Sequence, residues 1–192
     1  LGDVYKRQHL DNGTELVLYR GEAKQFRMRE GSTLSDEEEH QLIYEVVGKR
    51  AKRRTMHLLE QMDRTEQQLR DKLKQGGYPQ ACIDLALEYV KSFHYVDDYR
   101  YACTYINYRQ DRMSRYQLKV KLYGKGVSGE LVDRALEECY EGDEQDQIIR
   151  LLEKKKFDAQ NSDQKEFTRV YQYLMRRGFR SNDVLRAMKS KQ

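Results

Sequence analysis

A threefold internal repeat is the feature that most constrains how this chain can fold. Aligning the chain with itself at offsets of 49 and 52 residues superposes three segments with the same spacing of apolar residues and glycine. The segments are Leu69, Leu73, Gly77, Tyr78, Ile83, Ala86 and Leu87; Leu118, Leu122, Gly126, Val127, Val132, Ala135 and Leu136; and Val170, Leu174, Gly178, Phe179, Val184, Ala187 and Met188. Each predicts a helix whose i and i+4 positions face inward, a glycine that ends it in the left-handed conformation, and a second helix.

A further amphipathic stretch precedes each of these helix pairs, which makes three helices per unit. The stretches are 52–62, 98–110 and 143–155. Thr65 and Ser114, each followed by Gln three residues later, predict N-caps for two of the helices, and Asp163 with Glu166 predicts the third. Because a unit of about 50 residues buries little core by itself, we expect neighbouring units to touch in an elongated array.

The repeat divides the chain into four predicted parts. They are an N-terminal hairpin and helix at 1–47 and three-helix repeats at 48–96, 97–141 and 142–192. Residues 15–28 contain two short runs with β-branched and aromatic residues joined near Gly21, which predict a small β-hairpin, and Ser35 with Glu38 predicts a capped helix after it. Residues 1–8 fit poorly with the rest of the sequence, so we expect them to be non-native and leave them out of the predicted fold. The predicted fold class is mainly α.

Composition excludes several classes of protein. Charged residues make up 35% of the chain and hydrophobic residues 38%, which argues against one large shared core. No stretch approaches the roughly 18 apolar residues of a membrane span, and no secretory signal is evident, so we expect a cytoplasmic protein. The three cysteines, Cys82, Cys103 and Cys139, lack any Cys-x-x-Cys pair, and we expect neither a disulfide framework nor a metal site.

The sequence offers no recognisable catalytic constellation. The histidines are His9, His40, His57 and His94, and none has a Cys or carboxylate at the spacing of a nucleophilic or metal site. Asp97 and Asp98 could form an acid and base pair, but Asp98 stands where an amphipathic run begins, which favours a helix cap. We therefore predict that the chain is not an enzyme and needs no cofactor.

Basic residues gather in each repeat, and acidic residues gather at 130–146. The basic clusters are Lys49, Arg50, Lys52, Arg53 and Arg54; Arg109, Arg112, Arg115, Lys119, Lys121 and Lys125; and Arg176, Arg177, Arg180, Arg186 and Lys189. Mixed with tyrosines, they suit nucleic acid or an acidic protein surface, and the alternative is a solvated helix face. Many of the fifteen tyrosines, such as Tyr78, Tyr89 and Tyr95, fall on apolar positions, where we expect core or joint residues.

Four short motifs, in order along these repeats, resemble the RecX family of recombination regulators. Residues 95–102 read Tyr-Val-Asp-Asp-Tyr-Arg-Tyr-Ala and are followed by Tyr105 and Arg109, with His94 where the family usually has glycine. The family's motif at the opening of a helix in the first unit is similar to residues 64–69. The Lys-Gly-Ile that ends a helix of the second unit matches residues 125–127, and the Leu-x-Arg-Arg-Gly-Phe near the C-terminus matches residues 173–179. The resemblance covers nearly the whole chain from about residue 11.

The resemblance implies three tandem three-helix repeats in an elongated, curved array. It also implies a monomeric, non-catalytic protein that binds the RecA filament on single-stranded DNA and inhibits its ATPase, strand exchange and growth. The candidate contacts with filament or DNA are Arg100, Arg109, Arg115, Lys119, Lys121, Lys125, Arg176 and Arg177. The residues assigned to the fold are Tyr95, Asp98, Tyr101, Gly77, Gly126, Gly178 and Phe179.

Two other functions stay open at this stage. A sequence-neutral DNA-binding helical module would act without RecA and would bind bare single-stranded DNA with a steep salt dependence. A purely structural helical adaptor would bind neither DNA nor RecA. Weak contact with single- or double-stranded DNA is also compatible with the RecA regulator, and none of the three involves a membrane.

Overall fold

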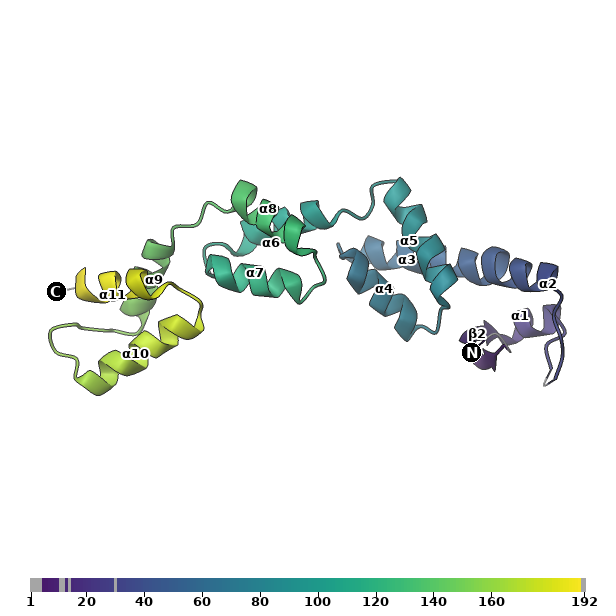
Figure 1. Cartoon of the computed structure of the whole chain (residues 1–192), viewed down its shortest axis with the longest axis horizontal. Helices are drawn as coiled ribbons and strands as arrows, with labels where there is room; N and C mark the ends of the chain where they lie inside the picture. The colour runs from purple at the N-terminus through teal and green to yellow at the C-terminus, as the bar shows by residue number, and fades with distance from the viewer. Residues whose placement is uncertain (1–4, 11–12, 14, 30, 191–192) are drawn as a thin grey trace. The chain divides into compact units, whose positions relative to one another are not determined.

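The computed structural model describes residues 5–10, 13, 15–29 and 31–190, and it divides into two compact units, Leu1–Asp98 and Tyr99–Gln192. Figure 1 labels the α-helices of both units and strand β2. Their described part is mainly helical, as predicted, with a two-stranded sheet near the N-terminus. None of the helices described combines the length and apolar character that a membrane crossing requires.

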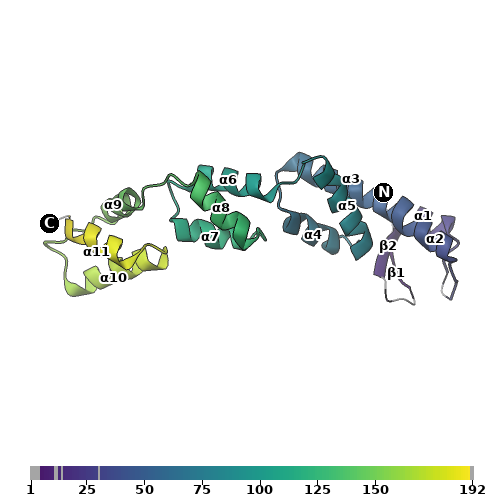
Figure 2. The ribbon, with the colours of Figure 1, turned by 45° about the horizontal axis from the view of Figure 1, so that its top comes forward.

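The N-terminal hairpin lies earlier in the chain than predicted. Strand β1 (Tyr5–His9) pairs antiparallel with β2 (Glu15–Tyr19), as Figure 2 shows, so excluding residues 1–8 from the fold was wrong for residues 5–8. The expected turn near Gly21 is also wrong, because α1 (Arg20–Gln25) follows β2 directly. The carboxylate of Glu22 accepts from the backbone N–H of Tyr19 at 2.8 Å, and this local cap starts a helix where strand propensity predicted a turn.

A long helical run connects the hairpin to the first repeat. It comprises α2 (Asp36–His40), a π-helical segment η1 (Gln41–Val47) and α3 (Gly48–Gln61). The predicted cap is confirmed, since the Ser35 hydroxyl accepts from the N–H of Glu38. The π-helical segment ends where the N–H of Gly48 donates to the carbonyl of Ile43, five residues back, and that carbonyl also accepts from the thiol of Cys82.

The first repeat consists of α3, α4 (Glu66–Gln75) and α5 (Gln80–Ser92), and it shares one core with the hairpin. Leu16 and Leu18 of β2 are buried in the same cluster as Leu69 and Leu73 of α4. Arg50 of α3 joins the two parts, because its guanidinium donates to the Glu22 carboxylate at 2.7 Å and to a carbonyl of β2. This predicted member of a basic surface cluster is therefore largely buried and paired.

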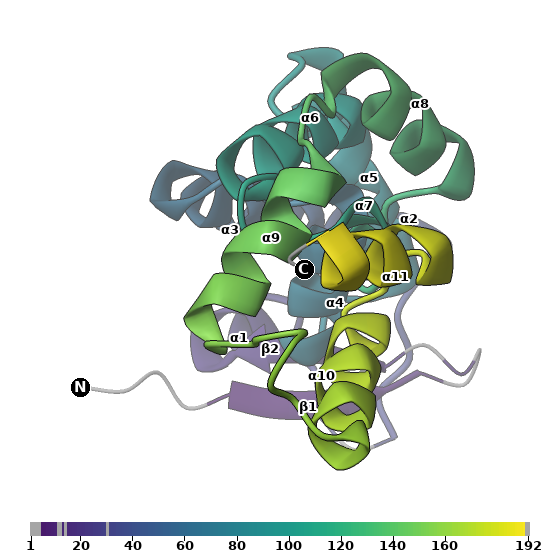
Figure 3. The same ribbon diagram turned by 90° about the vertical axis from the view of Figure 1, so that its left-hand side faces the viewer.

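The second and third repeats each have a core of their own. The second comprises α6 (Asp98–Arg109), α7 (Arg115–Tyr123) and α8 (Gly129–Cys139), and the third α9 (Glu144–Lys154), α10 (Gln164–Arg176) and α11 (Ser181–Ser190). Figure 3 shows α9, α10 and α11 grouped together. The predicted apolar positions of these two repeats are buried, including Phe179 in the third, and those of the first are buried except for the partly buried Tyr78. The periodicity thus located the core of every repeat.

The caps and turns predicted from the repeat are confirmed. The side chains of Thr65, Ser114 and Asp163 accept from the N–H groups of the residues three positions later. Gly77, Gly126 and Gly178 have φ angles of +73°, +81° and +80°, the left-handed conformation that ends each helix.

Two predictions about individual side chains are wrong. Cys103 and Cys139 form a disulfide between α6 and α8, although the cysteine spacing gave no reason to expect one. Tyr89, expected in the core or at a joint, is 38% exposed on α5, whereas Tyr95, 46% exposed, lies in the segment between α5 and α6 where the joint was predicted. Their rings instead pack against the exposed ring of Phe93, at 5.1 and 5.6 Å between centroids.

Candidate basic–aromatic interaction surface

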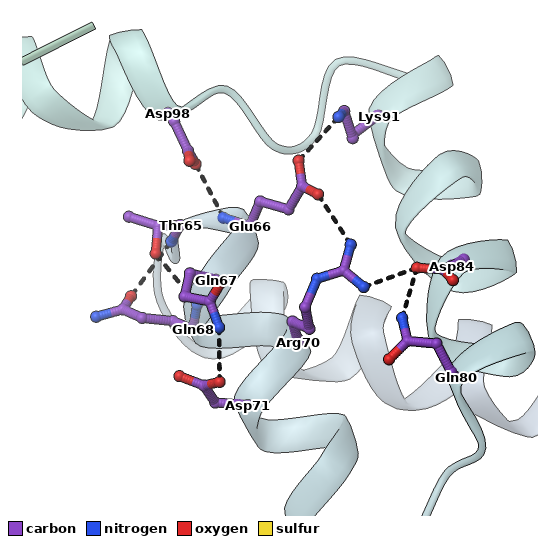
Figure 4. A network of polar contacts seen from close by, with 10 residues as sticks. All are labelled: Thr65, Glu66, Gln67, Gln68, Arg70, Asp71, Gln80, Asp84, Lys91 and Asp98. Carbon is purple, nitrogen blue, oxygen red and sulfur yellow. Dashed lines mark hydrogen bonds and ion pairs between the residues drawn. The ribbon is translucent and has the colours of Figure 1, made fainter. Parts of the chain in front are cut away.

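Asp98 lies in a polar network at the start of α4 (Figure 4). Its carboxylate accepts from the backbone N–H of Glu66 at 2.9 Å, so it satisfies the end of α4, whereas the sequence predicted a cap for its own helix. Burial raises the pKa of Asp98. The pKa of Glu66 is lowered, mainly by a hydrogen bond from Lys91, and Arg70 also binds this carboxylate. The basic groups on this face are therefore paired with acids.

The second repeat places two predicted contact residues on tyrosine rings. The guanidinium of Arg109 lies 4.7 Å from the centroid of Tyr105, and the ammonium of Lys125 lies 5.3 Å from the same centroid. Tyr101, which we assigned to the fold, stacks on Tyr105 and lies 5.9 Å from Lys125. These contacts hold two cations at one aromatic pair, an arrangement that can bind an anionic partner.

The remaining predicted residues of the second repeat differ in their surroundings. Lys119 forms an ion pair with Asp133 at 2.5 Å, which raises the pKa of Lys119. Lys121 and Arg100 are exposed on the helices that carry them. Arg115 is exposed beside Tyr140, with 5.8 Å between guanidinium and ring centroid. Lys119 is thus already neutralised, whereas Arg109 and Lys125 are brought together.

The third repeat places Arg176 and Arg177 at the end of α10, around Tyr173. Arg177 lies 4.8 Å from the Tyr173 centroid, and Lys155 lies 4.6 Å from it. The hydroxyl of Ser114, in the second repeat, donates to the carbonyl of Arg177 at 2.6 Å. The arginine pair is therefore fixed at the contact between the second and third repeats.

Two surface cavities flank this position, and Tyr173 lines both. The first cavity, of about 310 Å³, is lined by Arg112, Arg150, Lys154 and Arg177. The second cavity, of about 320 Å³, is lined by Lys155, Arg169 and Arg176. The sequence-based list of contact residues did not include Arg150, Lys154, Lys155 or Arg169. Arg150 and Lys154 could have been found, because they stand four residues apart on the polar side of a predicted amphipathic helix.

The chain is similar to proteins of one family along most of its length. Models of the first, second and third three-helix domains of RecX match residues 51–89, 97–136 and 142–188. The regulatory protein RecX of Caldanaerobacter subterraneus subsp. tengcongensis is 29% identical, over 84% of this chain and 80% of that protein. The regulatory protein RecX of Geobacillus kaustophilus is 32% identical over 81% of this chain, which spans 59% of that relative.

Two solved structures have the same fold. One is a crystal structure of regulatory protein RecX, with a TM-score of 0.70 and 20% identity, and the similarity covers 98% of this chain and 100% of that one. The other is RecX from Lactobacillus salivarius, with a TM-score of 0.66 and 17% identity, covering 76% of this chain and 96% of that one. At these identities the likeness concerns the fold.

Proposed function

Since the chain belongs to the RecX family, we propose that it is a non-catalytic cytoplasmic regulator that binds the RecA filament on single-stranded DNA. In this role it inhibits the filament's ATPase, strand exchange and growth. The observation that carries the proposal is the ordered match of all three helical repeats to the family's three domains. The relatives with this arrangement are named regulatory proteins, which fits a modulator of another protein.

The tandem architecture supports a partner that is itself repetitive. Each repeat of the second unit has its own buried core, so each can present a surface of its own. Several linked weak contacts to neighbouring protomers of a filament would raise the total affinity well above that of one contact. The basic residues around Tyr105 and Tyr173 provide charged and aromatic groups for such contacts.

The test is the rate of DNA-dependent ATP hydrolysis by RecA, titrated with this chain at fixed single-stranded DNA and salt. We expect inhibition well below one chain per RecA, and no hydrolysis by the chain alone. An unchanged rate with the folded chain would contradict the proposal. Inhibition only at concentrations that saturate the DNA would favour the alternative, a DNA-binding module that acts without RecA.

A pair of variants connects the inhibition to the predicted residues. Replacing Arg176 and Arg177 together by alanine should weaken inhibition, because both lie at the cavities around Tyr173. The matched control replaces Arg186 and Lys189 of α11, which removes the same charge from the same repeat away from these cavities. Inhibition that is equal in both variants, with unchanged melting temperatures, would remove Arg176 and Arg177 from the contact surface.

A further inference from the structure

The basic side chains of the first cavity converge without acidic partners. Arg112, Arg150, Lys154 and Arg177 all line it, and none forms an ion pair with a carboxylate within the described part of the chain. Some arginines outside the cavity do have acidic partners, for example Arg50 with Glu22 and Arg134 with Glu138. Asp111 is the one acidic residue in the lining, so the cavity carries an excess of positive charge. Such an excess around a concave surface attracts anions.

Hydrogen bonds between the two repeats hold the cavity in shape. Gln147 of α9 is only 4% exposed, and its Nε2 donates to the carbonyl of Gln110 at 2.6 Å and to the Tyr140 hydroxyl at 3.3 Å. The bond from Ser114 to the carbonyl of Arg177 fixes the opposite wall. Because these contacts already restrain the backbone that carries the cations, the chain loses less conformational entropy when a ligand binds.

The second cavity adjoins the first through Tyr173 and extends the basic surface. Lys155 and Arg176 line it and also lack an acidic partner among the described residues, while Arg169 is paired with Glu166. Neighbouring Arg176 and Arg177 therefore face separate cavities. Two adjacent anion sites match a chain of regularly spaced charges better than they match one isolated carboxylate.

The chemistry of the lining favours phosphate over carboxylate partners. Arginine binds phosphate oxygens through two parallel hydrogen bonds, and it predominates in both cavities. The guanidinium of Arg177 over the ring of Tyr173 also offers a flat surface on which a base can stack. We propose that the two cavities bind successive phosphates of single-stranded DNA. This assignment builds on the proposed function, in which the regulator acts on RecA-coated single strands.

The experiment measures binding of a fluorescent twelve-residue oligothymidylate to the full chain, without RecA, between 0.05 and 0.5 M salt. The test variant replaces Arg150 and Lys154 by glutamine, since both are exposed and line the first cavity. The matched control replaces Arg186 and Lys189 by glutamine. Removing one phosphate interaction with a single strand lowers the salt slope by about 0.7, so we expect the slope of the test variant to fall by about 1.4 and its binding to weaken roughly 25-fold at 0.1 M salt. The affinity of the control should change less than about threefold.

Three results would overturn the assignment. They are no measurable binding by the unmodified chain, equal weakening in the test and control variants, and competition by inorganic phosphate as effective as that by oligothymidylate at equal phosphate concentration. An oligoglutamate peptide distinguishes the remaining case: if the test variant loses affinity for the peptide but keeps it for DNA, the cavities bind an acidic protein surface.

The RecA assay on the same variants separates this inference from the proposed function. If the unmodified chain inhibits RecA but does not bind oligothymidylate, the DNA site is refuted and the regulator stands. If it binds oligothymidylate through the two cavities but leaves RecA unaffected, the site stands and the proposed function is refuted.

Discussion

The contact between Asp98 and the start of α4 leads to a prediction about stability, which separates the effect of the Asp98 hydrogen bond from the effect of its negative charge. In the structure, the Asp98 carboxylate accepts from the N–H of Glu66, a group that has no partner inside its own helix. Replacing Asp98 by alanine removes the acceptor and should cost about 1 kcal/mol, the usual value of an N-terminal cap. Replacing it by asparagine keeps an acceptor oxygen and should cost less than half of that.

The pH dependence of folding stability tests the role of Asp98 in a second, independent way. Burial raises the pKa of Asp98, so the folded state binds a proton more tightly than the unfolded state does. The stability that Asp98 contributes is therefore greatest at low pH, and it declines as the pH rises from the ordinary aspartate range through the raised pKa. The asparagine variant does not titrate there, so its stability relative to the unmodified chain should rise through this window.

Amide hydrogen exchange at residues 66–69, followed by NMR, is the appropriate assay because it reports on this helix end alone. Unfolding of a chain with two compact units need not be a single transition. A cost of 1 kcal/mol corresponds to about fivefold faster exchange in the alanine variant. If the alanine and asparagine variants exchange equally fast, the carboxylate does not cap α4 and the reasoning is wrong.

Three further predictions concern the turns and the cysteines. Gly178→Ala should lower the free energy of unfolding in urea by about 2–5 kcal/mol, because Gly178 has a left-handed backbone and an added Cβ would also overlap the ring of Tyr116. Gly31→Ala is the control and should cost about 1–2 kcal/mol, because Gly31 is also left-handed but an added Cβ would meet no neighbouring atom. Reduction of the Cys103–Cys139 disulfide, which closes a separation of 36 residues, should destabilise the second unit by about 4 kcal/mol, and equal unfolding midpoints with and without dithiothreitol would contradict this. The buried Cys82 thiol, with its pKa raised to about 11, should resist alkylation at pH 8 in the native, reduced chain while the other two react, as counted by mass spectrometry.

The core of the repeats was predictable because it depends on local rules. An apolar residue at i and i+4 followed by a glycine specifies a buried helix face and a left-handed end, whatever the rest of the chain does. The caps at Thr65, Ser114 and Asp163 depend on residues three positions away. Spacing within a single segment therefore contained the information needed for the helices and their ends.

The N-terminal hairpin was misplaced because two local preferences compete there. Residues 15–28 contain enough β-branched and aromatic residues for two strands, yet Glu22 caps a helix that begins immediately after β2. Pairing with Tyr5–His9 then satisfies the edge of β2, and Leu16 and Leu18 are buried in the core of the first repeat. The strand pairing thus depends on tertiary burial, which a strand-by-strand reading does not include.

The candidate site depends on residues that are distant in sequence. The first cavity is formed by Arg112 from the turn between α6 and α7, Arg150 and Lys154 from α9, and Arg177 from the end of α10. Basic clustering along the sequence located Arg112 and Arg177, but their convergence with Arg150 and Lys154 requires the second and third repeats to be in contact. The same limit applies to the disulfide, whose two cysteines meet only because α6 and α8 belong to one core.

The three repeats share the same helical frame but differ in charge at a pair of equivalent positions. The two residues before the left-handed glycine are Gln-Gly in the first repeat, Gly-Lys in the second and Arg-Arg in the third. The cation contributed there, Lys125 or Arg177, lies over a tyrosine ring of its own repeat. Because the glycine already ends the helix in all three repeats, these cations are not needed for the turn. Their increase from none to two along the chain supports the proposal that the third repeat contributes to an anion-binding surface.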